Sequence, residues 1–137
     1  MFFKKNNDEN KLDDFAKVAA LLIHAAKIDE IYSNKEEQLI KKTLIEIGAD
    51  NQSLEIILKK GKIIEEDAVQ ILDFTKEVKN MDEKNKIKVV EALWQIIYSN
   101  KDVDIYEANL MRRLAGLLYI DSKIMGDIKE RIRKKNL

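Results

Sequence analysis

Apolar residues recur every three or four positions along most of the chain, which is the spacing of one face of an α-helix. Seven helices are predicted, with these apolar positions: Leu12, Phe15, Ala19, Leu22, Ile23 and Ala26 in the first, to about Ile28; Leu39, Ile40, Leu44 and Ile47 in the second; Leu54, Ile57 and Leu58 in a short third; Ala68, Ile71, Leu72 and Val78 in the fourth; Ile87, Val90, Leu93, Trp94 and Ile97 in the fifth; Leu110, Met111, Leu114, Leu117 and Leu118 in the sixth; Ile124, Ile128 and Ile132 in the seventh. Residues 2–9 are mostly polar and are expected to fray. The pattern therefore predicts an all-α fold.

Short polar signatures mark where two of these helices should begin. In a capping box, a Ser or Thr and the Glu three residues later each hydrogen-bond the other residue's free backbone N–H. Ser33 and Glu36 have this spacing, and Asp104 and Glu107 repeat it with Asp in place of Ser. We therefore expect helix starts at both places.

Glycine and proline usage limits the fold class. Proline is absent, and only four glycines occur in 137 residues. All-β sandwiches and barrels, which need many tight turns, are therefore disfavoured. Gly48 is predicted to end the second helix and Gly61 the third, because glycine readily takes the left-handed conformation that follows a helix. Asp121 or Ser122 is predicted to cap the seventh.

A shift of 71 residues aligns the chain with itself. The matching pairs are Val18 with Val89, Leu22 with Leu93, Asp29 with Asn100, Glu36 with Glu107, Leu39 with Leu110, Lys41 and Lys42 with Arg112 and Arg113, and Asp50 with Asp121. One offset covers two helices, the loop between them and the next cap, which indicates a tandem repeat. We predict a single domain over 1–137, with repeat 1 at about 11–61, repeat 2 at about 82–135 and a linking helix at about 64–79.

The two repeats should pack face to face, because each alone can bury only one apolar stripe. Four long helices would then form the core, and shorter ones would cover its ends. Trp94 and Phe74 are predicted core residues, because aromatic side chains at helical spacing usually pack. His24 is predicted to be a half-buried histidine with a satisfied hydrogen bond rather than a catalytic one, because no Ser or Cys partner is implied by spacing.

The residue types that the chain lacks exclude several classes of functional site. Cysteine is absent, which excludes disulfides and thiolate metal sites, and the single histidine excludes His-rich zinc sites. No apolar run is long enough to span a bilayer, and the start Met1–Asn10 is too polar for a signal peptide. We expect a cytoplasmic location.

Charge is balanced overall but unevenly placed. Residues 1–68 hold 11 basic and 14 acidic side chains, which leaves 14 basic and 11 acidic ones for residues 69–137. The chain ends in the cations Arg131, Arg133, Lys134 and Lys135. The simplest interpretation is a solvated last helix turn, where cations are favourable. The alternative is a peripheral module that docks this basic helix on anionic lipid or nucleic acid.

Several motifs resemble the tellurite-resistance TerB family, and most closely its uncharacterised bacterial branch. The motifs are Asp73-Phe74-Thr75, Glu91-Ala92-Leu93-Trp94, Tyr98-Ser99-Asn100 with Glu107, Arg112-Arg113-Leu114-Ala115-Gly116-Leu117-Leu118, and Ala25-Ala26 leading to Asp29 and Glu36. The resemblance implies an all-helical domain of about seven helices in two pseudo-repeats. It also implies a non-enzymatic role linked to stress response and to metal or metalloid tolerance, with acidic loop residues proposed to bind divalent metal.

The family's loop reads Asp-Gly, five further residues, then Glu. The matching positions are Asp29 with Glu36 and Asn100 with Glu107, but Glu30 and Lys101 replace the glycine and Asn100 replaces the second aspartate. Loss of the glycine removes the residue that most cheaply takes a positive φ, so loop geometry should differ. Loss of the aspartate charge should weaken a cation site.

The sequence of the second loop also suggests a cation site independently of the family resemblance. Asn100, Asp102 and Asp104 alternate, as the oxygen ligands of a calcium loop begin, and Glu107 would complete a Ca²⁺ or Mg²⁺ site. The loop is not an EF-hand, because Ile105 stands at the sixth position, where an EF-hand needs glycine. The competing interpretation is that Asp104 and Glu107, like Ser33 and Glu36, only cap helices.

No enzyme motif accompanies these residues. The carboxylates Asp29, Glu30, Glu36 and Glu37 cluster, but they are expected at an exposed helix junction where nothing raises a pKa. Sequences typical of nucleophile elbows, phosphate loops and dinucleotide sites are absent. We therefore expect a non-enzymatic binding or adaptor domain with a protein partner rather than nucleic acid, and with at most peripheral contact with a membrane.

Overall fold

Seven α-helices account for most of the chain in the computed structural model, which describes residues 2–28, 33–68, 72–99 and 105–135 (side chains from 11 onward, excluding those of residues 72 and 73). The elements are α1 (Phe2–Lys27), α2 (Asn34–Glu46), the 3₁₀ turn η1 (Asn51–Ser53), α3 (Leu54–Asp67), α4 (Leu72–Lys79), α5 (Glu83–Tyr98), α6 (Ile105–Leu117) and α7 (Ser122–Lys135). No strand occurs in these ranges. The predicted all-α fold is confirmed.

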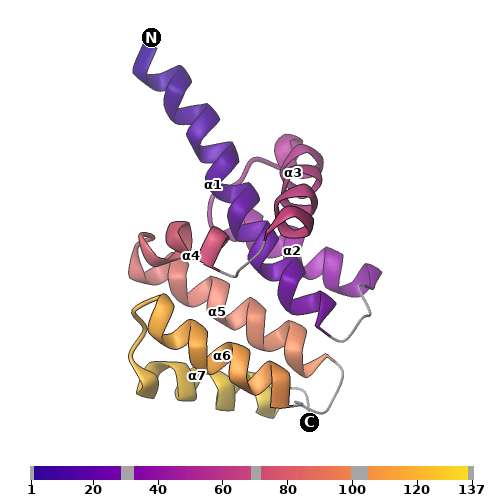
Figure 1. Cartoon of the computed structure of the whole chain (residues 1–137), viewed down its shortest axis with the longest axis vertical. Coiled ribbons are helices and arrows are strands. Elements are labelled where there is room, and N and C mark those ends of the chain that lie inside the picture. Colours follow the sequence, from indigo (N-terminus) through magenta and orange to yellow (C-terminus); the bar gives the residue numbers. More distant parts are fainter. Residues whose placement is uncertain (1, 29–32, 69–71, 100–104, 136–137) are drawn as a thin grey trace.

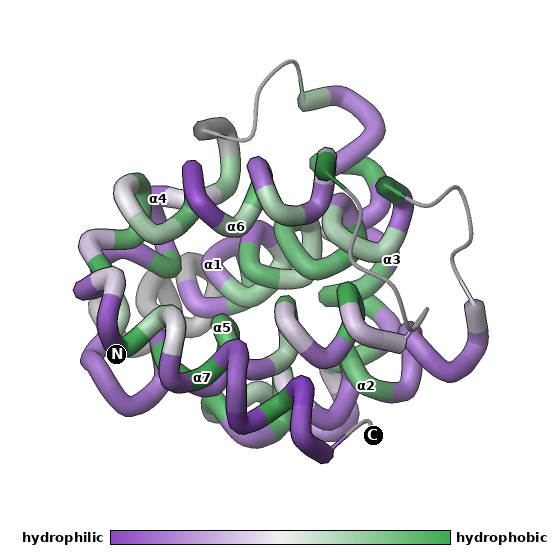
Figure 2. The backbone as a smooth tube through the Cα atoms, turned by 90° about the horizontal axis from the view of Figure 1, so that it is seen from below, coloured by the Kyte–Doolittle hydropathy of each residue, from purple (hydrophilic) through white to green (hydrophobic). Residues whose placement is uncertain are grey.

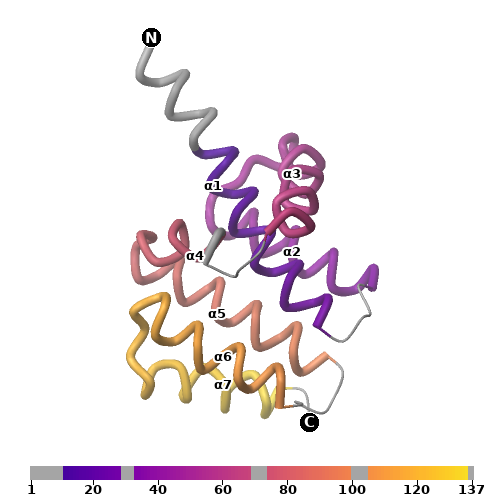
Figure 3. The backbone as a smooth tube through the Cα atoms, viewed as in Figure 1, coloured from indigo at the N-terminus to yellow at the C-terminus, as the bar shows by residue number. Residues whose placement is uncertain are grey.

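The first helix of each predicted repeat lies at the centre of the molecule. α1 contacts α2, α3, α4 and α5, and α5 contacts α7, α2 and α4 (Figure 1). The trace in Figure 3 shows α5, α6 and α7 stacked below α1, α2 and α3. α4 joins the two halves through contacts with α1, α5 and α6. The predicted packing of two helical units around one core agrees with this arrangement.

The core is apolar and continuous across both halves. Its largest fully buried side chains come from α1, α2, α3, α4, α5 and α6: Leu21, Leu22, Ile23, Ile40, Leu44, Ile57, Phe74, Leu93, Ile96, Ile97, Met111 and Leu114. α7 adds Met125, Ile128 and Ile132, while its outer turns are hydrophilic (Figure 2). Burial of these side chains is the main source of stability.

Two predicted boundaries are wrong. α1 begins at Phe2 rather than near Leu12, because neither proline nor glycine interrupts residues 2–11. α3 does not end at Gly61 but continues to Asp67, so residues 64–67 belong to α3 rather than to a linking helix over 64–79. Gly61 lies where α3 crosses α1, and a Cβ added there would be 2.9 Å from the Ala19 Cβ. Gly61 therefore permits close packing of α3 against α1 and does not end α3.

The ends of α2 and α6, which the 71-residue offset relates, have matching backbone hydrogen bonds. After α2, the N–H of Ala49 donates to the Leu44 carbonyl at 2.8 Å. After α6, the N–H of Ile120 donates to the Ala115 carbonyl at 3.0 Å. Each residue before the donor has a positive φ: Gly48 at 116° and Tyr119 at 55°. These matched ends support the proposed duplication.

The side chains of Asp50 and Asp121 also match across the repeats. Asp50 Oδ1 accepts from the Gln52 N–H at 3.3 Å, and Asp121 Oδ1 accepts from the Lys123 N–H at 2.7 Å. Of the two candidates for capping α7, Asp121 therefore supplies the side-chain bond.

Replacing Gly48 by alanine is expected to destabilise the protein by about 1–2 kcal/mol, because a Cβ is strained at positive φ. The nearest side-chain atom to the added Cβ is the Phe15 Cζ at 3.8 Å, so the backbone conformation and not a clash sets the cost. Urea denaturation of the two proteins measures the difference. An unchanged midpoint would contradict the left-handed assignment.

Candidate functional site

Glu36 forms the predicted capping box at the start of α2. Its Oε1 accepts from the Ser33 N–H at 3.0 Å and from the Ser33 hydroxyl at 2.9 Å, while the Glu36 N–H donates to Ser33 Oγ at 3.3 Å. The expectation of an exposed junction is wrong for this residue, which is only 3% exposed. Gln95 and Ser99, at the end of α5, line a small pocket together with Glu36, so this junction faces the other repeat and not open water. Its Oε2 is buried and has no hydrogen-bond partner among the described residues.

Glu107 occupies the corresponding position in the first turn of α6 and is 1% exposed. A nearly fully buried carboxylate is unusual unless it is hydrogen-bonded or coordinates a cation. Both repeats therefore bury one glutamate at the start of their second helix. The spacing alone had marked these residues as caps and ligands, but not as buried.

The other predicted cation ligands lie outside the described residues: Asp29, Asn100, Asp102 and Asp104. Among the residues that are described, no group of three or more His, Asp or Glu side chains has an arrangement that would hold a metal ion. The structure thus places Glu36 and Glu107 at the ends of the two loops. The role of the other four residues as cation ligands stays a prediction.

His24 has a carboxylate partner. Its Nδ1 lies 3.3 Å from Glu65 Oε2, and Lys27 Nζ donates to the other oxygen of Glu65 at 2.6 Å. The Glu65 hydrogen bond raises the pKa of Lys27. The side chain of His24 is 36% exposed, so the prediction of a half-buried, hydrogen-bonded histidine is confirmed.

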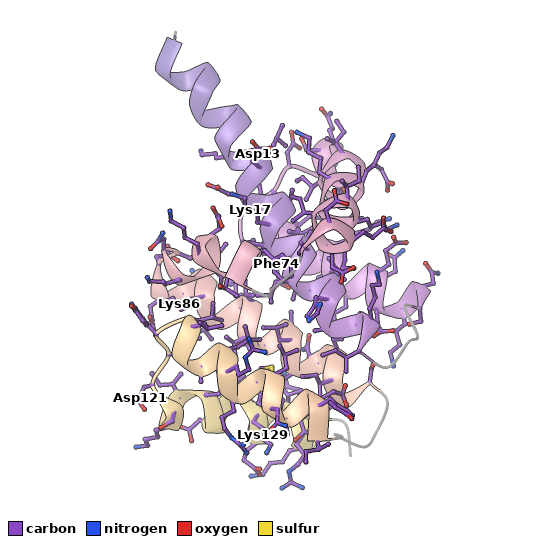
Figure 4. The ribbon with its side chains drawn as sticks, in the orientation of Figure 1. Asp13, Lys17, Phe74, Lys86, Asp121 and Lys129 are labelled. Atoms are coloured by element: carbon purple, nitrogen blue, oxygen red, sulfur yellow. The ribbon has the colours of Figure 1, made fainter. Side chains whose placement is uncertain are left out.

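Both predicted aromatic core residues are buried, with Phe74 1% and Trp94 4% exposed. Phe74 projects from α4 toward α1 (Figure 4), where its ring centroid lies 5.9 Å from that of His24. Trp94 stacks on Tyr98 at 5.8 Å, and Lys129 Nζ lies 5.6 Å from the Trp94 ring centroid. Desolvation raises the pKa of Tyr98.

Two of the cations near the end of α7 are already paired. Arg131 donates to Glu91 at 2.7 Å, and Arg133 makes two bonds to Glu130, at 2.8 and 3.3 Å. The Arg133 hydrogen bonds lower the pKa of Glu130. These pairs reduce the positive charge that α7 can offer to an anionic surface. Docking on lipid or nucleic acid stays a prediction.

Two pockets, which the sequence reasoning missed, occupy equivalent places in the two repeats. The α1/α6 pocket measures about 390 Å³ and is lined by His24, Ile28, Tyr106, Asn109, Leu110 and Arg113. The α5/α2 pocket measures about 230 Å³ and is lined by Gln95, Ser99, Lys35, Glu36, Leu39 and Lys42. The 71-residue shift relates His24 to Gln95, Ile28 to Ser99, Tyr106 to Lys35, Leu110 to Leu39 and Arg113 to Lys42. Each pocket therefore combines the end of one repeat's first helix with the start of the other repeat's second helix.

Within the described ranges, no helix is both long and apolar enough to cross a membrane. Residues 15–130 match the family model described as Tellurite resistance protein TerB. Neither the curated proteins nor the solved structures gave a match. The family model spans both repeats, from the middle of α1 to near the end of α7, and the helical architecture agrees with the TerB domain. The chain belongs to the TerB family.

Proposed function

We propose that this TerB-family chain is a non-enzymatic binding domain that holds a divalent cation, Ca²⁺ or Mg²⁺, weakly at its interhelical loops. The supporting observation is the pair of buried glutamates at equivalent helix starts, Glu36 and Glu107. Each follows a loop whose sequence is rich in oxygen-bearing side chains. Hard cations prefer such carboxylate and amide oxygens.

The second loop is the stronger candidate. Asn100, Asp102 and Asp104 precede Glu107 there at every second residue, as the ligands of a calcium loop do, whereas in the first loop Asp29 and Glu30 are adjacent.

The first loop has support of its own. The buried Oε2 of Glu36, which lacks a hydrogen-bond partner among the described residues, fits a carboxylate that a cation would stabilise. The cation would neutralise these carboxylates. The family's role in stress response and in metal or metalloid tolerance is proposed for this chain on the same basis.

Calorimetric titration with CaCl₂ and MgCl₂ tests the cation site. We expect a dissociation constant of about 10⁻⁴–10⁻³ M, because the loop lacks the glycine and the first aspartate of the family pattern. At 10 mM cation, a dissociation constant of about 10⁻³ M stabilises the fold by about 1.4 kcal/mol, which appears as a higher melting temperature.

Asp102→Asn should weaken binding because it removes a ligand charge. Asp127→Asn is the matched control, since Asp127 is an exposed carboxylate on α7. Ser33→Ala separates capping from coordination: it should cost about 1 kcal/mol of stability and leave the second-loop affinity unchanged. Absence of both heat and a melting shift would contradict the cation proposal.

A further inference from the structure

The α1/α6 pocket carries a cation whose charge the described part of the chain does not neutralise. Arg113 is exposed at its edge and makes no hydrogen bond or ion pair with any described residue. Lys42 holds the equivalent position in the α5/α2 pocket and is likewise without such a contact there. By contrast, the neighbouring cations Lys41 and Arg112 contact Glu55 and Asn109. The repeat therefore places a cation without a described partner at the same position of each pocket, and Lys35 adds a second one to the α5/α2 pocket.

Asn109 adds a hydrogen-bond donor beside Arg113. Its Oδ1 accepts from Arg112 Nη1 at 3.3 Å, which leaves the two N–H groups of its amide to face a ligand. Glu65 holds the His24 ring, which forms part of the pocket wall, from the side of Nδ1. A guanidinium with an adjacent amide donor matches a carboxylate, which accepts two parallel hydrogen bonds from arginine.

The rest of the same pocket is apolar. Ile28, Leu110 and Tyr106 line it, and Tyr106 is 74% exposed. An apolar ligand group in the pocket would cover the Tyr106 ring and the apolar wall beside it.

We propose that the α1/α6 pocket binds a carboxylate attached to an apolar group. Arg113 and Asn109 would hold the carboxylate, and Ile28, Leu110 and Tyr106 would cover the apolar group. Its volume of about 390 Å³ lies in the range of small-ligand sites. The α5/α2 pocket would take the same class more weakly, because it is smaller, offers the point charges Lys35 and Lys42 in place of the arginine fork, and is lined by the carboxylate of Glu36, which repels an anion.

Two sources supply this chemistry: a free organic acid, or a protein C-terminus that ends in an apolar residue. The test titrates the full ¹⁵N-labelled chain with 4-phenylbutyrate and with a tetrapeptide ending in phenylalanine, and follows the amide resonances by NMR. We expect saturable shifts at the end of α1 and the start of α6. Tighter binding of the free acid identifies a small organic acid as the ligand type, and tighter binding of the peptide identifies a C-terminus.

Two kinds of control isolate the carboxylate contact. 4-Phenylbutyramide and the amidated peptide keep the apolar group but lose the charge, and they should bind at least about tenfold more weakly. Arg113→Gln should weaken the acids by about tenfold, whereas Lys134→Gln removes the same charge from the far end of α7 and should have no effect. Shifts that do not saturate, amides that bind as well as acids, or an Arg113→Gln variant with unchanged affinity would each overturn the proposal. The cation titration depends on residues that do not line the α1/α6 pocket, so a failure of either proposal leaves the other standing.

Discussion

Replacing Phe74 by alanine is expected to destabilise the protein by about 3–5 kcal/mol, the usual cost of removing a buried aromatic ring. Phe74 is 1% exposed and is the largest fully buried side chain of the described residues. It anchors α4, the short helix that contacts both α1 and α6. Loss of the ring would leave a cavity and would weaken the connection between the two halves.

Chemical denaturation of the Phe74→Ala variant measures this cost. Ile63→Ala is the matched control, since it also removes a large apolar side chain but from a position that is 52% exposed. That control should change the free energy of unfolding by no more than about 0.5 kcal/mol. Similar losses for both variants would show that burial at Phe74 does not set the stability.

Replacing Gly61 by alanine is expected to destabilise the protein by about 1–3 kcal/mol, although alanine is the better helix former. The added Cβ would lie 2.9 Å from the Ala19 Cβ, 3.1 Å from the Ala16 carbonyl oxygen and 3.3 Å from the Ala20 nitrogen. Two of these atoms belong to the backbone of α1, so they move only if the helices separate. The added methyl group must therefore push α3 away from α1.

Gly126→Ala is expected to change the stability in the opposite direction. Gly126 lies inside α7, and no atom outside its own helix's local backbone is within 4 Å of an added Cβ. Alanine there should stabilise the protein by about 0.5–1 kcal/mol through its helix propensity. Thermal or urea unfolding of the pair measures the contrast. If Gly61→Ala were also stabilising, the close crossing of α1 and α3 would be refuted.

These two glycines show why sequence reasoning failed at Gly61. A glycine that ends a helix and a glycine that admits a neighbouring helix both depend on the missing Cβ, so the residue type is the same. At Gly48 the local pattern was sufficient to predict the helix end, because the positive φ needed there is a property of the local backbone. At Gly61 the cause is α1, some 40 residues earlier in sequence, and no local pattern contains it.

The candidate site likewise has some features that were predictable from the sequence and others that were not. The Ser33–Glu36 capping box was predictable because both partners lie within one helical turn. The burial of Glu36 was not, because the side chains opposite it across the α5/α2 pocket belong to the other repeat. Likewise the 71-residue offset related Lys42 to Arg113, but nothing in it showed that each faces the end of the other repeat's first helix.

The helices, most of their caps and the duplication can be predicted from the amino-acid sequence, since periodicity, capping spacing and self-similarity are local or repeated properties of the chain. The fold was needed to show which glycine admits a neighbouring helix, which carboxylates are buried and where the paired pockets form. Burial and pockets depend on how helices that are distant in the sequence pack. Packing is set by the shape of both partners together, and neither helix encodes it alone.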